Sequence, residues 1–395
     1  FLGMGTQEMQ QTLTFQLDRL QAIGVNVVIF QVRPECDALY ESSLEPWSRF
    51  LTGRQGLAPS PYWDPLQWMI EQCHARGMEL HAWINPYRAK TKTTNSLASN
   101  HVGVQHPERC FSYDDLLILN PGIPENRNYI CDVARDIVTR YDVDGIHMDD
   151  YFYPYLDRGE RMDDEKEFRK YSAHGETVAQ FRRRCVSEAI AKIHDAIKRV
   201  RPEVVFSVSP QGNWRNNYND LYADIALWAR EGLVDVLIPQ LYYAEPEFKS
   251  NLEWFIQNAG QAHLLVGYAA YRFDRNSASA AFRDTGMLAS QYSHAAGTGK
   301  VEGAVFYNAS ALVSNKAGVR DKIRELFKDE ALAPYFCAPE APPAPIDSSL
   351  TVPLPLIFQG AVDRVLAPGE DSLKIPVDSV GSGLALRHRS ILYRN

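Results

Sequence analysis

Residues 10–30 read QQTLTFQLDRLQAIGVNVVIF, and this stretch contains the unit from which the fold is predicted. Residues 10–23 place apolar side chains at the spacing of an amphipathic helix, and Gly24 is a typical helix end. The apolar run at residues 26–30 follows directly and has the length of a buried strand. A helix followed at once by a strand is the repeating unit of an α/β protein.

The same unit recurs along most of the chain. Further helices are expected at residues 65–76, 126–141, 176–200, 221–231, 248–258, 287–294 and 316–327. Strands are expected to begin near Asn26, Glu79, Gly145, Val204, Val234, His263 and Gly303. Because helices between strands require parallel pairing, this α/β pattern over about 320 residues favours a closed (β/α)8 barrel over an open sheet. No phosphate-binding glycine-rich loop opens these helices, which argues against a nucleotide-binding fold.

Seven strands are one fewer than such a barrel needs. We expect the first strand to be missing from this sequence, upstream of Phe1, with the apolar residues 116–119 as the other possible eighth strand. The barrel domain is assigned to residues 1–330, and a proline-rich linker to residues 331–346. Residues 347–395 contain short β-like runs that resemble part of a small β-sandwich.

The composition argues against several partners. The 395 residues hold 41 Lys and Arg against 49 Asp and Glu, a net charge of −8, without a basic block. Nucleic acid and anionic membranes are therefore poor partners. No apolar stretch is long enough to span a membrane. The six cysteines lack the spacing of a metal site or a disulfide framework.

Polar side chains gather at the expected strand ends, at the alternate positions whose side chains point towards the barrel axis. These inward positions are Gln31, Arg33, His81, Trp83, Asn85, His147, Asp149, Ser207, Ser209, Gln211, Gln240, Tyr242 and Tyr268, with Tyr307 or Asn308. Barrel enzymes build their active sites at the carboxyl ends of the strands. We therefore expect a functional pocket at this end of the barrel.

The sharpest chemical signal is the stretch DGIHMDDYFY at residues 144–153. Asp149 would point inward and suits a nucleophile, a base or a group that stabilises positive charge. Its alternative is a structural carboxylate paired with Arg33 or Arg88. Asp150 is either a proton-transfer partner of Asp149 or the cap of a loop, and Asp144 suits a structural turn.

Aromatic residues are dense around the same strand ends. They are Tyr40, Trp83, Tyr87, Tyr151, Phe152, Tyr153, Trp214, Tyr242, Tyr243, Tyr268 and Tyr271. Flat aromatic faces interspersed with amide and guanidinium groups suit a sugar, which is apolar on its CH face and polar at its hydroxyls. The pattern therefore indicates a carbohydrate-binding cleft.

Several motifs, in this order and spacing, resemble the glycosyl-hydrolase-like family 10 of bacteria. They are NVVIFQVRP (residues 26–34), DALY (37–40), HAWINPYR (81–88), LNPG (119–122), DGIHMDDYF (144–152) and PQLYY (239–243). No cofactor is expected. The resemblance implies a TIM barrel and a bacterial envelope location, in the periplasm or as an outer-membrane lipoprotein anchored upstream. It also implies cleavage of peptidoglycan glycan strands stripped of peptides, and a C-terminal fibronectin type III-like module.

Cleavage of a glycosidic bond ordinarily uses two carboxyl groups, one of which acts as the general acid. Asp149 and Asp150 are the first candidates, Glu245 after the sixth barrel strand is a further catalytic candidate, and Glu35 and Asp37 are alternatives. A second mechanism uses the acetamido oxygen of an N-acetylated sugar as nucleophile, with an enzyme acid and an orienting Asp. The stretch at residues 144–151 is distantly similar to the chitinase motif on strand four, but Tyr151 occupies the position of the chitinase acid.

The expected substrate-binding set draws on many strands. It comprises Gln31, Arg33, His81, Trp83, Asn85, Tyr87, Arg88, His147, Tyr151, Trp214, Gln240, Tyr242 and Tyr268. No metal site is expected, because neither His81 nor His147 lies in an HxH pair. A glycoside hydrolase is the main hypothesis, and a non-catalytic glycan-binding barrel is the alternative.

Overall fold

The computed structural model describes residues 3–94, 96–113, 115–156 and 161–327, together with Ala331, Ala333 and Phe336. The chain divides into two units, Phe1–Ala338 and Pro339–Asn395. The expected β module at residues 347–395 and most of the expected linker lie outside the described residues. The described helices and strands all belong to the first unit.

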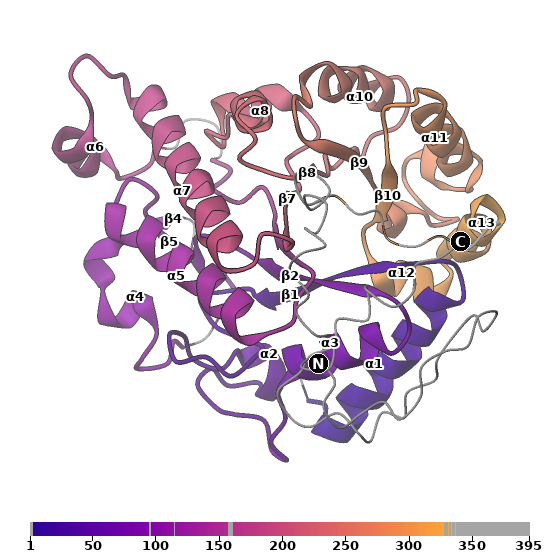
Figure 1. The fold of residues 1–395 in the computed structure, drawn as a ribbon, viewed down its shortest axis with the longest axis horizontal. Coiled ribbons are helices and arrows are strands. Elements are labelled where there is room, and N and C mark those ends of the chain that lie inside the picture. The colour runs from indigo at the N-terminus through magenta and orange to yellow at the C-terminus, as the bar shows by residue number, and fades with distance from the viewer. Residues whose placement is uncertain are drawn as a thin grey trace, which may run out of the picture. The chain divides into compact units, whose positions relative to one another are not determined.

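Seven parallel strands, curled into a half-barrel, form the centre of the fold (Figure 1). They are β1 (Val27–Arg33), β2 (Glu79–Ile84), β6 (Gly145–Met148), β7 (Val205–Val208), β8 (Val236–Leu237), β9 (His263–Tyr268) and β10 (Gly303–Phe306). Each strand pairs in parallel with the next one in this order. The predicted α/β barrel class and the positions of all seven strands are confirmed.

Helices surround this sheet (Figure 1). They are α1 (Thr6–Gln21), α2 (Arg49–Thr52), α3 (Pro65–His74), α4 (Val102–Gln105), α5 (Pro124–Arg140), α6 (Glu165–Tyr171), α7 (Val178–Val200), α8 (Trp214–Asn219), α9 (Ile225–Arg230), α10 (Glu247–Asn258), α11 (Gly286–Gly297), α12 (Ala309–Ser314) and α13 (Val319–Leu326). The first helix illustrates why they form: Leu13, Leu17 and Leu20 are buried along one face of α1. Gly24 then turns the chain into β1 with a positive φ of 82°.

The alternative eighth strand at residues 116–119 is wrong as a barrel strand. These residues form β5 (Leu116–Leu119) in a separate antiparallel sheet, between β3 (Arg88–Lys90) and β4 (Cys110–Tyr113). Leu116 pairs with Tyr113 across a two-residue connection. A turn this short permits only antiparallel pairing, since a parallel neighbour requires a long crossover.

The inside of the curved sheet changes from apolar to polar along the strands. Its lower layer is apolar and comprises Ile29, Val205, Val236, Ile238, Leu265 and Val305, with Phe336 packed against them. Further along the same strands the inward positions become polar, including Ser207 on β7 and Gln240 after β8. The predicted placement of polar groups at the carboxyl ends is therefore confirmed for these strands.

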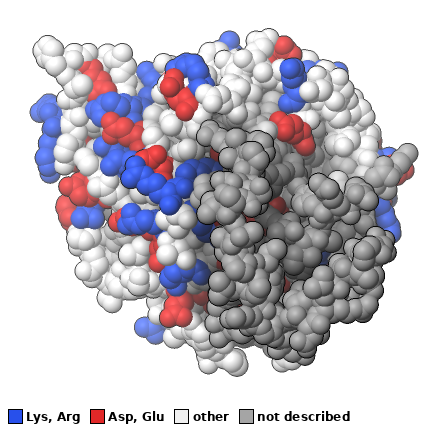
Figure 2. Space-filling view, in the orientation of Figure 1, with Lys and Arg blue, Asp and Glu red and all other residues white. Residues whose placement is uncertain are grey.

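The described surface mixes charges of both signs. On the face shown in Figure 2, acidic and basic side chains alternate rather than forming a patch of one sign. On α7, the ion pairs Arg184–Glu188 and Arg199–Asp195 each join charges of opposite sign. Of the helices in the described ranges, none is long and apolar enough to cross a membrane.

Candidate active site

A cavity of about 1040 Å³ runs along the inside of the curved sheet. Towards the carboxyl ends of the strands its lining comprises Trp83, Asp149, Asp150, Tyr151, Ser209, Gln240, Tyr242, Tyr271 and Tyr307, with His81, His147 and Ser207 beneath them. Eight of the predicted site residues thus line the same cavity: His81, Trp83, His147, Asp149, Asp150, Tyr151, Gln240 and Tyr242. The carboxyl end of the barrel is therefore the candidate active site.

Asp149 and Asp150 lie at the end of β6, and each is only 4% exposed. Local packing fixes this strand: Gly145 leaves room for the ring of His81, which a Cβ would approach to 2.6 Å. Asp144 accepts a hydrogen bond from the Leu80 backbone N–H at 2.8 Å. The structural part expected for Asp144 therefore fits its position, which ties β6 to β2.

The carboxylate of Asp149 is held by donors from three directions. The Trp83 indole Nε1 donates to Oδ2 at 3.1 Å. The Asn85 amide donates to Oδ1 and Oδ2 at 3.2 and 3.1 Å, and the Tyr151 backbone N–H donates to Oδ1 at 3.3 Å. Such donors favour the charged carboxylate and fix its orientation.

The two adjacent carboxyls influence each other's protonation. Burial, followed by the negative charge of Asp150, raises the pKa of Asp149 to about 6. Burial also raises the pKa of Asp150, against an opposing hydrogen bond from the Tyr155 hydroxyl. Two interacting acids of this kind titrate as a unit, so the pair retains a proton at mildly acidic pH.

His147 and Ser207 lie in the layer below the acid pair. His147 Nδ1 lies 2.9 Å from the Ser207 hydroxyl. Burial, with a smaller effect of His81, lowers the pKa of His147 to about 3. Within the described residues, no group of three or more His, Cys, Asp or Glu side chains is arranged to hold a metal ion.

An aromatic wall, formed by Tyr242, Tyr271 and Tyr307, lines the mouth of the cavity. The rings of Tyr242 and Tyr307 stack with their centroids 6.1 Å apart, and Tyr271 meets both edge-on. Tyr271 and Tyr307 are each 42% exposed. The predicted binding set omitted these two residues, although their signal was present in the aromatic density and in the inward parity of Tyr307.

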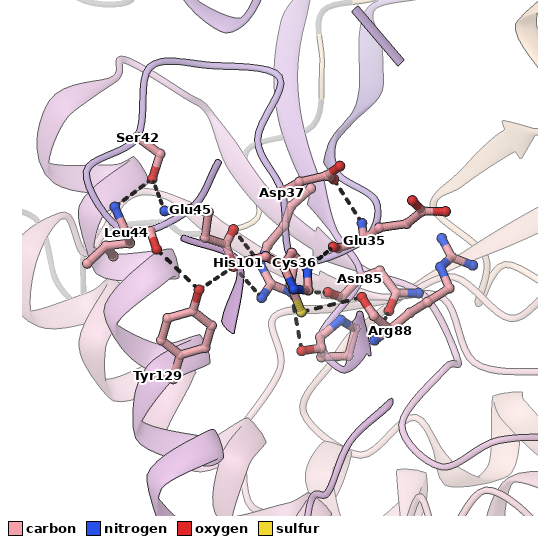
Figure 3. Close-up of polar contacts among 12 residues, drawn as sticks. Glu35, Cys36, Asp37, Ser42, Leu44, Glu45, Asn85, Arg88, His101 and Tyr129 are labelled. Atoms are coloured by element: carbon pink, nitrogen blue, oxygen red, sulfur yellow. Dashed lines mark hydrogen bonds and ion pairs between the residues drawn. The ribbon is translucent and has the colours of Figure 1, made fainter. Parts of the chain in front are cut away.

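Other predicted binding residues lie outside the cavity lining. Arg33 is fully buried and pairs with Glu45, whose other partner is the Tyr129 hydroxyl at 2.8 Å (Figure 3). Gln31 and Tyr87 also lie outside it, and Tyr87 is 1% exposed. Trp214 stacks on Trp254 of α10, with the ring centroids 5.3 Å apart. Asn85 acts through the carboxylate of Asp149, to which its amide donates.

The expectation that Tyr268 points into the barrel is wrong. Tyr268 is 1% exposed and stacks between Phe248 of α10 and Phe306 of β10. It follows the outward positions Leu264 and Val266 at the same parity, so its ring faces the helices.

The structure does not bring the other candidate acids to the cavity lining. Glu245 forms an ion pair with Lys249, with 3.3 Å between Oε2 and Nζ. Glu35 is held by Arg49 and Thr91. Burial alone would raise the pKa of Glu35, but these hydrogen bonds outweigh it and lower the pKa. Burial raises the pKa of Asp37 to about 6, and its carboxylate accepts from Gln55 at 3.0 Å.

Replacing Trp83 with Phe isolates the indole N–H. Trp83→Phe keeps an aromatic ring against His147 and Tyr307 but removes the donor to Asp149. We expect kcat/KM to fall by roughly tenfold or more, because a hydrogen bond to a charged group contributes about 1.5–3 kcal/mol. Steady-state kinetics would measure this loss. The matched control is Trp254→Phe on α10, for which an equal loss would contradict the assignment.

Comparisons with known proteins agree with this architecture. The profile of the family described as Glycosyl hydrolase-like 10 matches residues 3–278. Glycosyl hydrolase YngK of Bacillus subtilis is 34% identical over 359 residues, which cover 85% of this chain and 70% of that protein. Glycosyl hydrolase DigH of Escherichia coli K12 is 36% identical over 293 residues, which cover 67% of this chain and 66% of that protein.

Solved structures share the fold at low identity. The glycoside hydrolase domain of PgaB (BpsB) from Bordetella bronchiseptica has a TM-score of 0.55 at 12% identity, covering 80% of this chain and 93% of that domain. The catalytic domain of β-amylase from Paenibacillus polymyxa has a TM-score of 0.53 at 10% identity, covering 82% and 95%. The family match and this fold together support a glycosidase-type function.

Proposed function

Because the chain belongs to the glycosyl hydrolase-like 10 family, we propose that it is a glycoside hydrolase acting on a bacterial cell-wall glycan or a related N-acetylated glycan. The observation that carries the proposal is the buried pair Asp149 and Asp150, at the carboxyl end of β6 in a cavity with an aromatic wall. Burying two adjacent carboxyls costs a protein free energy, and acids with perturbed pKa values are concentrated at functional sites. Such a glycan lies outside the cytoplasm, so the proposal includes an extracytoplasmic location in the bacterial envelope.

The cavity offers what a sugar ring needs. The exposed rings of Tyr271 and Tyr307 each offer an apolar face to the CH groups of a pyranose. Gln240, whose amide donates to the Ser209 carbonyl at 2.9 Å, adds a polar group beside the acid pair. This combination supports a carbohydrate substrate.

The arrangement of the acids favours participation by the substrate. Direct displacement needs two carboxyls flanking the scissile bond, whereas Asp149 and Asp150 are consecutive residues on one strand end. In the proposed reaction one carboxyl of the pair donates its proton to the leaving glycosidic oxygen. The acetamido oxygen of the substrate attacks the anomeric carbon, and water then opens the cyclic intermediate and returns a proton. The other carboxyl of the pair stays charged and orients the acetamido N–H. Asp149 suits this part when Asp150 carries the shared proton, because three donors fix its orientation.

Digestion of peptide-free peptidoglycan strands tests this function. Mass spectrometry of the products should show new reducing ends at one type of linkage, with chitooligosaccharides as a second substrate. Binding of the strands without any product would support a glycan-binding barrel instead. Loss of turnover in Glu245→Gln would favour direct displacement with two separated carboxyls.

The activity should depend on pH through the acid pair. Because the pKa of Asp149 is raised to about 6, the pair still carries a proton below that pH and loses it above. We expect kcat/KM to fall by about tenfold for each pH unit above about 6, since the proton donor is lost. A pH–rate profile from pH 4 to 8 measures this, and a flat profile between pH 6 and 8 would contradict it.

A further inference from the structure

Arg88 is not itself among the residues that line the cavity, but it lies over Tyr151, which does, and its charge acts on the acid pair. Its backbone is fixed at the start of β3, where the N–H donates to Asn85 Oδ1 at 2.9 Å. The guanidinium carbon lies 5.4 Å from the centroid of the Tyr151 ring, and Tyr151 lines the cavity and is 43% exposed. In Figure 3 Arg88 is on the opposite side of the cluster from Tyr129. Arg88 is thus a half-buried cation next to a residue that lines the cavity.

The guanidinium of Arg88 uses little of its hydrogen-bonding capacity. Its Nε donates to the Pro34 carbonyl at 3.0 Å. Among the described residues, neither terminal nitrogen has a hydrogen-bond acceptor, and Arg88 forms no ion pair. The nearby Arg33 and Arg49 contrast with it, because each is paired with a glutamate. Both terminal NH2 groups of the guanidinium fork therefore remain available beside Tyr151.

The charge of Arg88 acts on the reacting groups without pairing with them. Its positive charge opposes the rise in the pKa of both Asp149 and Asp150 and also acts on Tyr307. An anionic substrate would otherwise be repelled by two aspartates. A cation beside them offsets this repulsion, and the planar fork of Arg matches a carboxylate.

We infer that Arg88 is a specificity-determining residue that binds a carboxylate substituent of the glycan, borne by a sugar at the scissile bond. This inference rests on the proposed function for the nature of the polymer. It assigns the enzyme to glycans whose sugars carry free carboxylates, as muramic acid residues do after their peptides are removed. Amidation or peptide substitution of that carboxylate would abolish the contact.

Binding measurements separate this inference from the hydrolase proposal. In an Asp149→Asn background, calorimetry compares peptide-free glycan strands with the same strands after their carboxyls are converted to amides. We expect Arg88→Gln to weaken binding of the free-carboxylate strands by roughly 10- to 100-fold and to leave the amidated strands unchanged. Arg88→Lys keeps the charge without the fork and should recover only part of the affinity.

The matched control is Arg183→Gln on α7. Arg183 also lies over a tyrosine ring and donates to a carbonyl, both from Tyr218, but Tyr218, unlike Tyr151, does not line the cavity. Its replacement should change neither affinity. Equal losses on the two kinds of strand, no loss for Arg88→Gln, or no binding to either strand by the parent would overturn the inference. A difference between the strands without turnover by the wild type would overturn the hydrolase proposal alone.

Discussion

Asp149→Asn is expected to lower kcat on peptide-free glycan strands by roughly 100- to 10,000-fold, the range that a positioned proton-transfer group contributes. The substitution keeps the shape of the side chain and one acceptor oxygen for Trp83 or Asn85. It removes the negative charge that would orient the acetamido group, and with it the shared titration of the pair. Quantifying new reducing ends per enzyme measures the loss.

Two further variants define the interpretation of this loss. Asp150→Asn should fall in the same range, because either carboxyl alone cannot provide both a proton and a charge. Glu302→Gln is the control, since Glu302 also lines the cavity but lies beside His263, with 2.8 Å between Oε2 and Nδ1. If Asp149→Asn and Asp150→Asn both retained wild-type turnover, the acid pair would not be the catalytic group.

Asp149→Asn should also stabilise the folded protein above pH 6. The folded-state pKa of Asp149 is raised, so the folded protein binds this proton more strongly than the unfolded chain. Stability of the wild type therefore falls as pH rises from about 4 to about 6 through this group. Asp149→Asn lacks that loss, so its free energy of unfolding should exceed that of the wild type at pH 7.5 and approach it near pH 4. Urea titrations at the two pH values measure the difference.

Strand parity explains how much of the site could be predicted from the sequence. The inward positions Ser207 and Gln240 follow from simple alternation along β7 and β8, and the structure places both in the cavity. Tyr268 was misassigned because β9 is regular to its last residue, which leaves Tyr268 on the outer face with Val266. A polar group on the ring does not determine which face of a sheet it occupies.

Contacts between a strand residue and a residue of the following loop could not be predicted from strand alternation. Arg33 has the inward parity expected of a binding residue, but its partner Glu45 lies twelve residues further on, in the connection between β1 and α2. Nothing in the spacing of these two residues indicates that they meet. Glu245 shows the same limit, since the path of the loop after β8 determines whether its carboxyl reaches the cavity.

Glu45→Gln is expected to lower the free energy of unfolding by about 3–5 kcal/mol, the cost of leaving one member of a buried ion pair without its partner. Glu45 and Arg33 have fully buried side chains, and the carboxylate accepts from both Nε and Nη2 of Arg33. The Tyr129 hydroxyl donates to the same carboxylate. The glutamine amide would keep the shape but leave the guanidinium charge uncompensated. Urea unfolding followed by circular dichroism measures the change.

An exposed pair provides the control for this loss. Asp195→Asn removes the charge partner of Arg199 on the surface of α7, where the two side chains are 62% and 79% exposed. Exposed pairs at this spacing contribute at most a few tenths of a kcal/mol, so this variant should unfold like the wild type. If Glu45→Gln also unfolded like the wild type, the buried positive charge of Arg33 would not depend on Glu45 for its neutralisation, and the prediction would be wrong.

Glu45→Gln should also lower the activity, because Arg33 connects Glu45 to the residues that hold Asp149. The guanidinium Nη1 of Arg33 donates to the carbonyls of Asn85 and Pro86, so the ion pair fixes the chain where it leaves β2. The side chain of that same Asn85 donates to Asp149. Folded Glu45→Gln at low temperature should therefore show a lower kcat, with KM changed less, because Asp149 loses part of its orientation. The double replacement Arg33→Met with Glu45→Leu removes both charges and should recover stability but not turnover, since Asn85 then has no guanidinium to hold its carbonyl.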